Sequence, residues 1–490
     1  MAGVTFAISL KKDYRVKKMK VLIINPPAYK NKDYIREGRC MQTKASWAAL
    51  WMPLSLAYLA AFLKKEGHQI KLIDCIAEKM DIGILRELVK DFSPQMVVVN
   101  SAFPSIKGDM VTAAEIKKAY QRAKIAIIGL YPTLLEKESL GQYQSIDFGI
   151  VGEPEWVIRD LAERLENNLP LEKIKGLIFR QGGEIRINQP QDLSQNNVNE
   201  LPFPARDLLN NEAYRLPTNR KKFTLLSIGR GCPYKCSFCV ANIYYGKKFR
   251  QRSVYSIIDE IEECLKKYDI NSFLFWGESF TLEPAYGEAI CDEIIKRDLK
   301  IVWSTASRVD TLNQKLLNKM KLAGCILLSL GIESVNQEVL DGVKKGINLA
   351  QIKKAIAMVK EAGINSMGHF IFGLPGETKK TVQKTTKFAL ASGVNYAQFY
   401  CAIPYPKTKL GVLARKSNWL KTDDYSQYDL IKSVMRNEIL TPDQVKKFRD
   451  RAYRKFYFRP KMLIQAIKEV NSLKSFFYIF NFIKWIKPEK

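Results

Sequence analysis

The chain has 490 residues, of which 47% are hydrophobic and 11% aromatic, with only 27 glycines and 20 prolines. This composition excludes a collagen-like, disordered or low-complexity protein, and the length favours about three globular domains. The formal net charge is +28, a surplus that suits an acidic protein, an anionic membrane surface or nucleic acid as a partner.

Residues 1–18 form a basic tail in which an apolar run precedes the positive charges. A signal peptide has the reverse order, so the sequence predicts no export. The following run, MKVLIINPP, makes Met19 an alternative start. Six of the nine cysteines are scattered singly. Lone cysteines of this kind are typical of a reducing compartment, and we expect a cytoplasmic protein.

Residues 19–165 alternate between strand-like and helix-like segments. The expected strands are 20–27, 70–75, 96–101, 124–130 and 148–153. Because these runs are apolar on both faces, they predict a doubly wound (Rossmann-like) parallel sheet covered by helices. In such a sheet a ligand lies beyond the carboxyl ends of the strands, here near 25–27, 100–105, 129–133 and 152–155.

The stretch 45–63 runs for 19 residues without a charge, which is about the length that spans a bilayer. A transmembrane helix is therefore one interpretation. The alternative is a buried helix that begins at Pro53 and ends at Lys64, Lys65 and Gly67. A strand follows at once, so we predict the buried helix of an α/β unit.

Residues 166–215 are rich in Asn, Gln and Pro and predict a connector with a short β-ribbon. Residues 216–430 then carry six further strand-and-helix units, which predict a partial (β/α)6 barrel of the TIM type with its active site at the carboxyl ends of the strands. Residues 431–490 form a basic helical region with 15 basic and 5 acidic side chains. A helix is expected to begin at Thr441.

The stretch GRGCPYKCSFC follows the first barrel strand and places Cys232, Cys236 and Cys239 at the spacing C-x3-C-x2-C. Three interpretations compete: a structural zinc, an iron–sulfur cluster with one open iron, and coincidental cysteines. Zinc sites close with four ligands, and only His68 and His369 are available, with no second C-x2-C. The aromatic residue before the last cysteine adds to the specificity of the motif, which favours the cluster.

With this motif and this barrel pattern, residues 216–430 resemble the radical S-adenosylmethionine (SAM) superfamily. The resemblance implies a [4Fe-4S] cluster whose open iron binds SAM. It also implies that an electron from a donor of the flavodoxin or ferredoxin type cleaves SAM to a 5′-deoxyadenosyl radical, which takes hydrogen from the substrate.

Other strand ends match the places where this family contacts SAM. WGES stands where the methionine amino group is held, although the family's first glycine is Trp276 here. GIES and the preceding strand end match the ribose and carboxylate contacts, and GHFIFGLPGE matches the adenine-side strand. The implied SAM contacts are Phe238, Gly277, Glu278, Arg308, Glu333 and Gly373.

The α/β domain in front of the barrel resembles a cobalamin-binding domain, through NPP, GLYPT, VGEPE and the connector LPFPARD. The implied cobalamin contacts are Asn25, Pro26, Pro27, Ser101, Gly129, Pro132, Thr133, Gly152 and Glu153. No Asp-x-His-x-x-Gly follows the first strand, and His68 lies at the opposite end of the sheet, where we interpret it as structural. The resemblance therefore implies cobalamin without a protein histidine on cobalt, as in radical SAM methyltransferases.

We expect such an enzyme to methylate an unactivated carbon of a small hydrophobic or lipid-like substrate, with one SAM methylating cobalamin and another supplying the radical. No general base is assigned. Tyr286, Tyr400 and Tyr405 are candidates for substrate contact, with packing as the alternative. Three other functions stay open: radical cyclisation or rearrangement, RNA modification by a methylthiotransferase, and a non-catalytic cobalamin sensor. We do not expect nucleic acid as a partner.

The C-terminal region bears on the substrate, because Phe476, Phe477, Phe480, Phe482 and Trp485 stand beside lysines. FYFRP at 456–460 also recurs in cobalamin-dependent radical SAM enzymes that act on lipid-like or tetrapyrrole substrates. The sequence therefore predicts peripheral contact with an anionic membrane, at the inner membrane surface. The alternative is a helix packed against the barrel.

Overall fold

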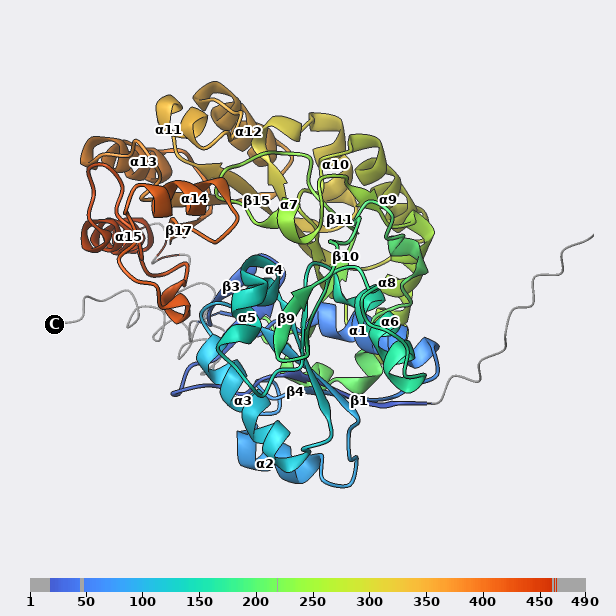
Figure 1. Ribbon diagram of the computed structural model, residues 1–490. Helices are drawn as coiled ribbons and strands as arrows, with labels where there is room; N and C mark the ends of the chain where they lie inside the picture. The colour runs from blue at the N-terminus through green and yellow to red at the C-terminus, as the bar shows by residue number, and fades with distance from the viewer. Residues whose placement is uncertain (1–17, 45–47, 218, 461, 463, 465–490) are drawn as a thin grey trace, which may run out of the picture.

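The protein is described by a computed structural model that covers residues 18–44, 48–217, 219–460, 462 and 464. It has two large sheets, each built from one half of the chain, and two small two-stranded ones, β2 (Tyr34–Glu37) with β3 (Cys40–Thr43) and β11 (Gly229–Arg230) with β12 (Arg250–Gln251). In Figure 1 the N-terminal half lies below, in blue and cyan, and the second sheet with its helices forms an arc above it, from green to orange. The predicted combination of a doubly wound sheet and a partial barrel is confirmed.

The N-terminal sheet has seven strands in the order β4-β1-β5-β6-β7-β8-β9. The first five in this order are parallel, and β8 and β9 are antiparallel additions. Their bounds are β1 Lys20–Asn25, β4 Gln69–Asp74, β5 Met96–Ser101, β6 Lys124–Gly129, β7 Phe148–Ile150, β8 Leu177–Gln181 and β9 Glu184–Ile187. All five predicted strands are therefore present.

Helices cover both faces of this sheet, as continuous apolar strands require. Helices α1 and α6 pack on one face, and α2 to α5 pack on the other. Their bounds are α1 Leu54–Lys65, α2 Ile82–Leu88, α3 Ile106–Ala119, α4 Leu130–Leu135, α5 Lys137–Gly141 and α6 Pro154–Glu166.

The apolar stretch that raised the question of a transmembrane helix forms the buried helix α1, as predicted. Pro53 is its N-cap, and Lys64 and Lys65 stand in its last turn. Residues 45–47 of the stretch lie outside the described residues. Within the described part of the chain, no helix has the length and apolar character needed to cross a membrane.

The second sheet has six parallel strands in the order β10-β13-β14-β15-β16-β17. It is a partly open barrel, because β10 and β17 are its two edges. The strands are β10 Phe223–Ser227, β13 Ser272–Trp276, β14 Val302–Arg308, β15 Cys325–Glu333, β16 Asn365–Phe372 and β17 Tyr396–Cys401. The helices are α7 Ala241–Tyr244, α8 Val254–Tyr268, α9 Pro284–Lys296, α10 Gln314–Leu322, α11 Gln337–Gly342, α12 Leu349–Glu361, α13 Lys379–Ala391, α14 Lys409–Lys416 and α15 Pro442–Tyr457.

Burial alternates along the barrel strands, as the two-residue period of a strand requires. On β16, Phe370 and Phe372 lie in the core between strands and helices. Met367, His369 and Ile371 alternate with them and stay partly exposed. The inner face of the barrel is therefore accessible from its mouth.

Three parts of the fold differ from expectation. A hairpin of β2 (Tyr34–Glu37) and β3 (Cys40–Thr43) was not predicted. The β-ribbon expected in the connector exists as β8 and β9, but it pairs with β7 and so extends the N-terminal sheet. After residue 430 the chain stays non-helical until α15, whose N-cap is Thr441, as predicted.

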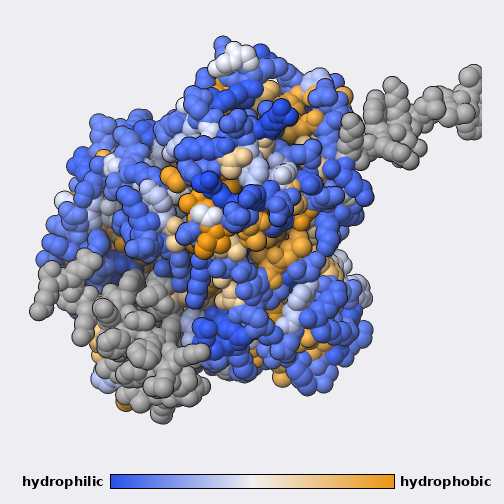
Figure 2. Space-filling model, turned by 90° about the horizontal axis from the view of Figure 1, so that it is seen from below, coloured by the Kyte–Doolittle hydropathy of each residue, from blue (hydrophilic) through white to orange (hydrophobic). Residues whose placement is uncertain are grey.

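Figure 2 shows the molecule from below: hydrophilic residues cover most of this face, and hydrophobic ones gather in its middle.

The FYFRP segment, residues 456–460, packs against the barrel. Phe456 is fully buried, Arg459 lies over its ring at 3.8 Å, and the Arg459 guanidinium donates to the Leu390 carbonyl at 2.7 Å. Residues 476–485, which carry the other aromatic side chains of this region, lie outside the described residues.

Candidate functional site

The cysteine loop leaves the end of β10 and lies over the barrel mouth. Cys232, Cys236 and Cys239 are all partly exposed, and the Ala241 amide donates to the Cys239 sulfur at 3.5 Å. Burial raises the pKa of the Cys239 thiol to about 12. A thiolate at this position therefore needs compensating positive charge, which iron supplies to a bound thiolate.

A site for a single metal ion needs at least three ligand side chains close together. Among the residues that the structure describes, no three His, Cys, Asp or Glu side chains are grouped closely enough to hold one metal ion. A cluster makes a different demand, because its cysteines bind different irons.

Two buried ion pairs fasten the start of the cysteine loop to the N-terminal half. Arg230 donates to both Glu155 oxygens, at 2.6 and 3.2 Å. Arg250, on the strand that pairs with residue 230, donates to both oxygens of Glu153. Both carboxylates are fully buried. A buried charge without its partner is energetically costly, so each carboxylate keeps its arginine. The two ion pairs therefore hold the cysteine loop in a fixed position against the N-terminal half.

This arrangement bears on two sequence expectations. Glu153, expected as a cobalamin contact, has its carboxylate engaged by Arg250 and by the Asn196 amide at 3.1 Å. The connector motif LPFPARD supplies Arg206, which donates to the Leu225 carbonyl of β10 at 2.8 Å and pairs with Glu260 at 2.6 Å. The motif therefore joins the barrel to the chain that precedes it.

Glu278, at the end of β13, faces the N-terminal half. Its side chain is 3% exposed, and its Oε2 lies 3.0 Å from Nη1 of Arg39, in the turn of the β2–β3 hairpin. The neighbouring Gly277 leaves room for Ile228, because a Cβ there would lie 2.8 Å from Ile228 Cγ1. A small cavity at this junction is lined by residues of both halves, among them Glu37, Ser55, Tyr58, Gly277 and Glu278.

Arg308 and Glu333, at the ends of β14 and β15, stand on the other side of the mouth. Arg308 Nη1 lies 3.8 Å from the Cys236 sulfur, and its Nε donates to Asp310 at 2.9 Å. Glu333 pairs with Lys345 at 2.7 Å. Arg308 is thus brought next to the cysteine loop.

Phe238 of the cysteine loop and Ile371 of β16 pack against one apolar cluster beside the barrel mouth. Gly373, just beyond β16, has φ +88° and donates its amide to Glu377 at 2.6 Å. Burial raises the pKa of Glu377 to about 8, although hydrogen bonds from the backbone of Gly373 and Leu374 act to lower it. The motif GHFIFGLPGE therefore ends in a tight turn close to the cysteine loop.

The expected cobalamin contacts gather at the carboxyl edge of the N-terminal sheet. The Gly152 amide donates to Thr133 Oγ1 at 3.0 Å, and that hydroxyl donates to the Gly129 carbonyl at 2.7 Å. Gly129 has φ +104°, and a Cβ there would lie 2.3 Å from the Ser101 carbonyl oxygen. Pro132 lies buried within α4, next to Thr133.

The first strand ends in the same region. Asn25 donates to Asp74 at 2.8 Å and accepts from Arg36 at 3.2 Å, and Arg36 also donates to the Pro26 carbonyl at 3.1 Å. Pro27, which follows, is buried, and the chain first becomes exposed at Ala28. The two glycines at this edge let its loops pack closely, Gly129 against the Ser101 carbonyl and Gly152 against Gln191 and Leu193.

The β2–β3 hairpin joins these two groups of residues. Arg36 reaches the end of β1, whereas Arg39 reaches Glu278 in the barrel. Cys40, which follows, is only partly buried, unlike the buried lone cysteines 75, 264, 291, 325 and 401. The hairpin was missed because strands of four residues are too short to show a periodic pattern in the sequence. The one signal for it was Gly38, which occupies the turn with φ +49°.

The three tyrosines differ in their surroundings. Tyr286 donates its hydroxyl to backbone carbonyls, including Ile228 at 2.6 Å, and Tyr405 is buried in the N-terminal core cluster. Tyr400, on the inner face of β17, donates to Gln398 at 2.9 Å and lies 3.3 Å from Nδ1 of His369. The packing alternative therefore describes Tyr286 and Tyr405 best. His68 is also structural, since its Nδ1 accepts the Met19 amide at 3.3 Å.

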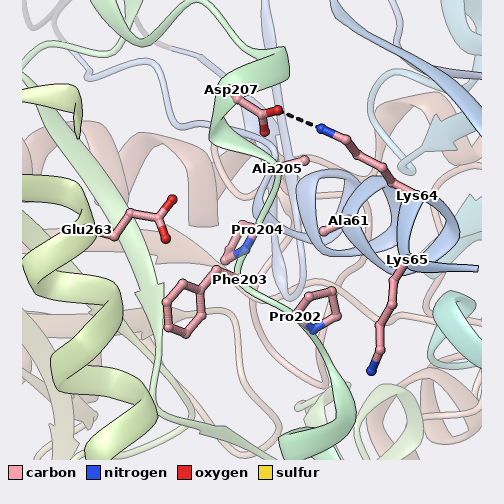
Figure 3. A pocket seen from close by; sticks show the side chains of 9 residues that line it. All are labelled: Ala61, Lys64, Lys65, Pro202, Phe203, Pro204, Ala205, Asp207 and Glu263. Carbon is pink, nitrogen blue, oxygen red and sulfur yellow. Dashed lines mark hydrogen bonds and ion pairs between the residues drawn. The ribbon is translucent and has the colours of Figure 1, made fainter.

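A surface hollow lies away from these residues, between α1 and the segment 202–207 (Figure 3). Lys64 and Asp207 form an ion pair of 2.8 Å at its edge, and Phe203 and Glu263 stand on the opposite side. None of the expected site residues lines this hollow. It is not a candidate for the cofactor site.

Replacing Glu278 with glutamine is expected to weaken SAM binding without affecting cobalamin. If Glu278 holds the ammonium group of SAM, loss of this charged contact costs about 1.5–3 kcal/mol, or roughly 10- to 100-fold in the dissociation constant. Equilibrium dialysis with both ligands measures this. Glu283→Gln, an exposed change five residues away, is the control; equal affinities in the two variants would refute the role.

His369 is expected to make the folded chain sensitive to acid. Burial lowers its pKa from 6.5 to about 4. Between these values the unfolded chain takes up a proton that the folded chain does not, so the free energy of unfolding falls with falling pH, by up to about 3 kcal/mol. Thermal midpoints from pH 7.5 to 4.5 should drop less in His369→Gln; parallel curves for both proteins would contradict this.

Comparison with known proteins agrees with both halves of the site. The Radical SAM superfamily model matches residues 226–389, and the B12 binding domain model matches residues 43–162. A protein of Pyrococcus horikoshii named as an uncharacterized methyltransferase is 33% identical over 455 residues, which cover 93% of this chain and 96% of the relative. The chain belongs to the cobalamin-dependent radical SAM methyltransferase family.

More distant members of the family carry other names. The anaerobic magnesium-protoporphyrin IX monomethyl ester cyclase of Cereibacter sphaeroides is 28% identical over 85% of this chain and 68% of the relative. The hopanoid C-3 methylase of Methylococcus capsulatus is 24% identical over 80% and 74%. The family therefore includes both methyltransferases and cyclases.

Solved structures share the fold. OxsB, with cobalamin and SAM bound, has a TM-score of 0.74 at 18% identity, covering 96% of this chain and 71% of that one. TsrM from Kitasatospora setae, with cobalamin and a [4Fe-4S] cluster bound, has a TM-score of 0.69 at 20% identity, covering 88% and 85%. As a radical SAM enzyme with a B12 binding domain, the chain uses a [4Fe-4S] cluster, SAM and cobalamin.

Proposed function

We propose that this enzyme transfers a methyl group from SAM, by way of cobalamin, to an unactivated carbon of a hydrophobic substrate. The observation that carries the proposal is the contact between the two cofactor regions. Arg39 lies 3.0 Å from Glu278, Lys407 beyond β17 donates to the Thr133 carbonyl at 3.1 Å, and Arg230 before Cys232 pairs with Glu155. Cobalamin at the sheet edge would therefore adjoin the barrel mouth.

The proposed roles follow from these positions. Cys232, Cys236 and Cys239 hold the cluster, which supplies the electron that cleaves SAM. Glu278 and Gly277 receive the ammonium group of SAM, Arg308 its carboxylate, Glu333 its ribose, and Phe238 and Gly373 border its adenine. Cobalamin, which supplies the methyl group, rests on the turns at Asn25–Pro27, Ser101, Gly129, Pro132–Thr133 and Gly152, while Glu153 positions this edge through Arg250.

Cobalt is proposed to have no protein histidine as ligand. The full sequence contains two histidines. His68 accepts the Met19 amide at the amino end of β1, and His369 lies on β16 beside Tyr400. Neither histidine would therefore be needed to hold cobalamin at the carboxyl edge of the N-terminal sheet, where it would supply the methyl group.

A hydrophobic substrate is supported by the inner face of the barrel. Leu274 and Trp276 of β13 and Met367 and Ile371 of β16 alternate with the core residues of their strands and are partly exposed, although Leu274 and Trp276 also pack against the N-terminal core. Relatives named for hopanoid and bacteriochlorophyllide methylation are consistent with such a substrate. The residues 473–490 are proposed to add membrane contact. Co-sedimentation with anionic liposomes, before and after removal of these residues, tests this; an unchanged bound fraction would contradict it.

The reaction is tested with SAM that carries a deuterated methyl group. The reconstituted enzyme, a reductant and an extract of organic-soluble metabolites should give 5′-deoxyadenosine and a product that is heavier by the labelled methyl group. Formation of 5′-deoxyadenosine with an altered but unlabelled product would instead establish radical cyclisation, the function suggested by the cyclases among the relatives.

A further inference from the structure

Five lysines surround the outer side of the cysteine loop. They come from the loop itself, from the segment after α7, from just beyond α11 and from the start of α14, and all are exposed: Lys235, Lys247, Lys248, Lys344 and Lys409. We refer to these residues as the lysine ring.

Backbone hydrogen bonds fix the lysine ring against the loop. The Ser237 amide donates to the Val343 carbonyl and the Leu410 amide donates to the Ser237 carbonyl, each at 2.9 Å. On the other side, the Cys232 amide donates to the Gly246 carbonyl at 3.1 Å. Lys247, Lys344 and Lys409 are adjacent in sequence to Gly246, Val343 and Leu410, the residues that make these hydrogen bonds. The positive charges are therefore held close to the three cysteines.

The lysine ring is short of negative charge. Repulsion from Lys344, together with burial and Lys235, lowers the pKa of Lys409. Within the described residues, no acidic side chain forms an ion pair with any of the five. The nearby Asp341 instead accepts from Gln337 at 2.9 Å.

Lysines elsewhere in the described barrel include paired ones and unpaired ones, such as Lys353, Lys354 and Lys360 on α12, so the lysine ring is distinguished by its position around the cysteine loop. On the barrel helices, Lys266 pairs with Glu262 at 2.7 Å and Lys319 pairs with Asp292 at 2.6 Å. Lys345, next to Lys344 in sequence, turns inward and pairs with Glu333. A surface that leaves clustered positive charges without partners suits an acidic macromolecule.

Apolar side chains adjoin the lysine ring. Helix α14 begins at Lys409. On this helix Val412 is 60% exposed and Leu413 is 39% exposed. A small apolar contact beside a charged rim is the usual anatomy of a protein interface, and brief electron-transfer complexes have the smallest interfaces of this kind.

We propose that the lysine ring is the docking surface for a small acidic electron-carrier protein of the flavodoxin class, which delivers the electron that the cluster needs. The carrier is oxidised by one electron and the cluster is reduced by one. This inference rests on the proposed role of the three cysteines. It explains why unpaired charge is placed around the loop that binds the cluster, where an electron from outside must enter.

The test is direct binding of a flavodoxin to the full-length holoprotein, measured by calorimetry at low and at high salt. Wild type should bind more weakly as salt rises, because exposed charges are screened. The variant Lys235→Glu/Lys344→Glu/Lys409→Glu should raise the dissociation constant at least about 10-fold at low salt and lose most of the salt dependence. Lys247→Glu/Lys248→Glu changes the two lysines that follow Gly246, which bonds to Cys232, and should act in the same direction.

The matched control is Lys353→Glu/Lys354→Glu/Lys360→Glu, which reverses three exposed lysines on α12. It should bind flavodoxin as wild type does. An equal loss in the control would show that only net charge matters, and unchanged binding in both ring variants would refute the docking surface. Loss of binding to anionic vesicles or RNA, with flavodoxin binding intact, would assign the surface to another partner and also overturn the proposal.

A second measurement separates this proposal from the proposed function. SAM cleavage driven by a small chemical reductant needs the cluster but no docking, so the ring variants should retain it at the wild-type rate while flavodoxin-driven cleavage falls at least about 10-fold. If both rates fell together, with iron content unchanged, the lysines would serve the reaction itself and the docking proposal would be wrong. If wild type cleaved no SAM with either reductant, the proposed function would fail instead.

Discussion

A chain in which Cys239 is replaced by alanine is expected to lose the [4Fe-4S] cluster and all cleavage of SAM, while it still binds cobalamin. Three cysteines already leave one iron without a protein ligand, so a cluster with two cysteines lacks the support to persist. Iron analysis after anaerobic reconstitution, the visible absorption of the cluster, and 5′-deoxyadenosine formation measure this result.

Cys401→Ala is the matched control. Cys401 is buried on β17 and belongs to the core on the helix side of the barrel. Its replacement should leave iron content near that of wild type. Retention of a full cluster in Cys239→Ala, or equal loss in both variants, would remove Cys239 from the cluster site.

Replacing Glu155 with glutamine is expected to destabilise the junction of the two halves by about 1.5–3 kcal/mol, because the buried Arg230 loses its charged hydrogen bonds and keeps only Glu153, at 3.7 Å, as an opposite charge. Both side chains are at most 9% exposed, and their contact is bidentate. Since Arg230 begins the cysteine loop, a lower cluster content should accompany the loss of stability. Thermal denaturation and iron analysis of the same samples test both effects.

An exposed pair provides the control for this prediction. Glu87 and Lys90 lie 3.7 Å apart with side chains 79% and 71% exposed, so Glu87→Gln should change stability by less than about 1 kcal/mol. The double variant Glu155→Gln/Arg230→Met should recover much of the stability, because no unpaired charge remains. A double variant as unstable as Glu155→Gln would show that the ion pair is not the cause.

The strands of both sheets could be predicted because their signals are local. Runs such as MVVVNS and KIAIIG are apolar on both faces, and each became a central strand, β5 and β6. The cysteine spacing was equally local, since all three residues lie within one loop. The same is true of Thr441, whose N-cap bonding to Gln444 needs only three residues of sequence.

The contacts between the halves could not be predicted, because they join residues far apart in sequence. Arg39 and Glu278 meet across 239 positions, and nothing near either residue specifies the other. Glu153 illustrates the consequence: its place in VGEPE suggested a cofactor contact, whereas the fold gives it Arg250 as a partner. A buried carboxylate takes the nearest cation that the tertiary structure offers, and sequence spacing does not disclose that cation.

The central claim is that the iron left without a cysteine binds SAM. Electron–nuclear double resonance of the reduced cluster, with SAM carrying 15N in its amino group or 13C in its carboxylate, tests this most directly. We predict hyperfine coupling from both labels in wild type, and from neither when unlabelled SAM competes. A reduced cluster that binds SAM elsewhere, without coupling to either label, would contradict the account.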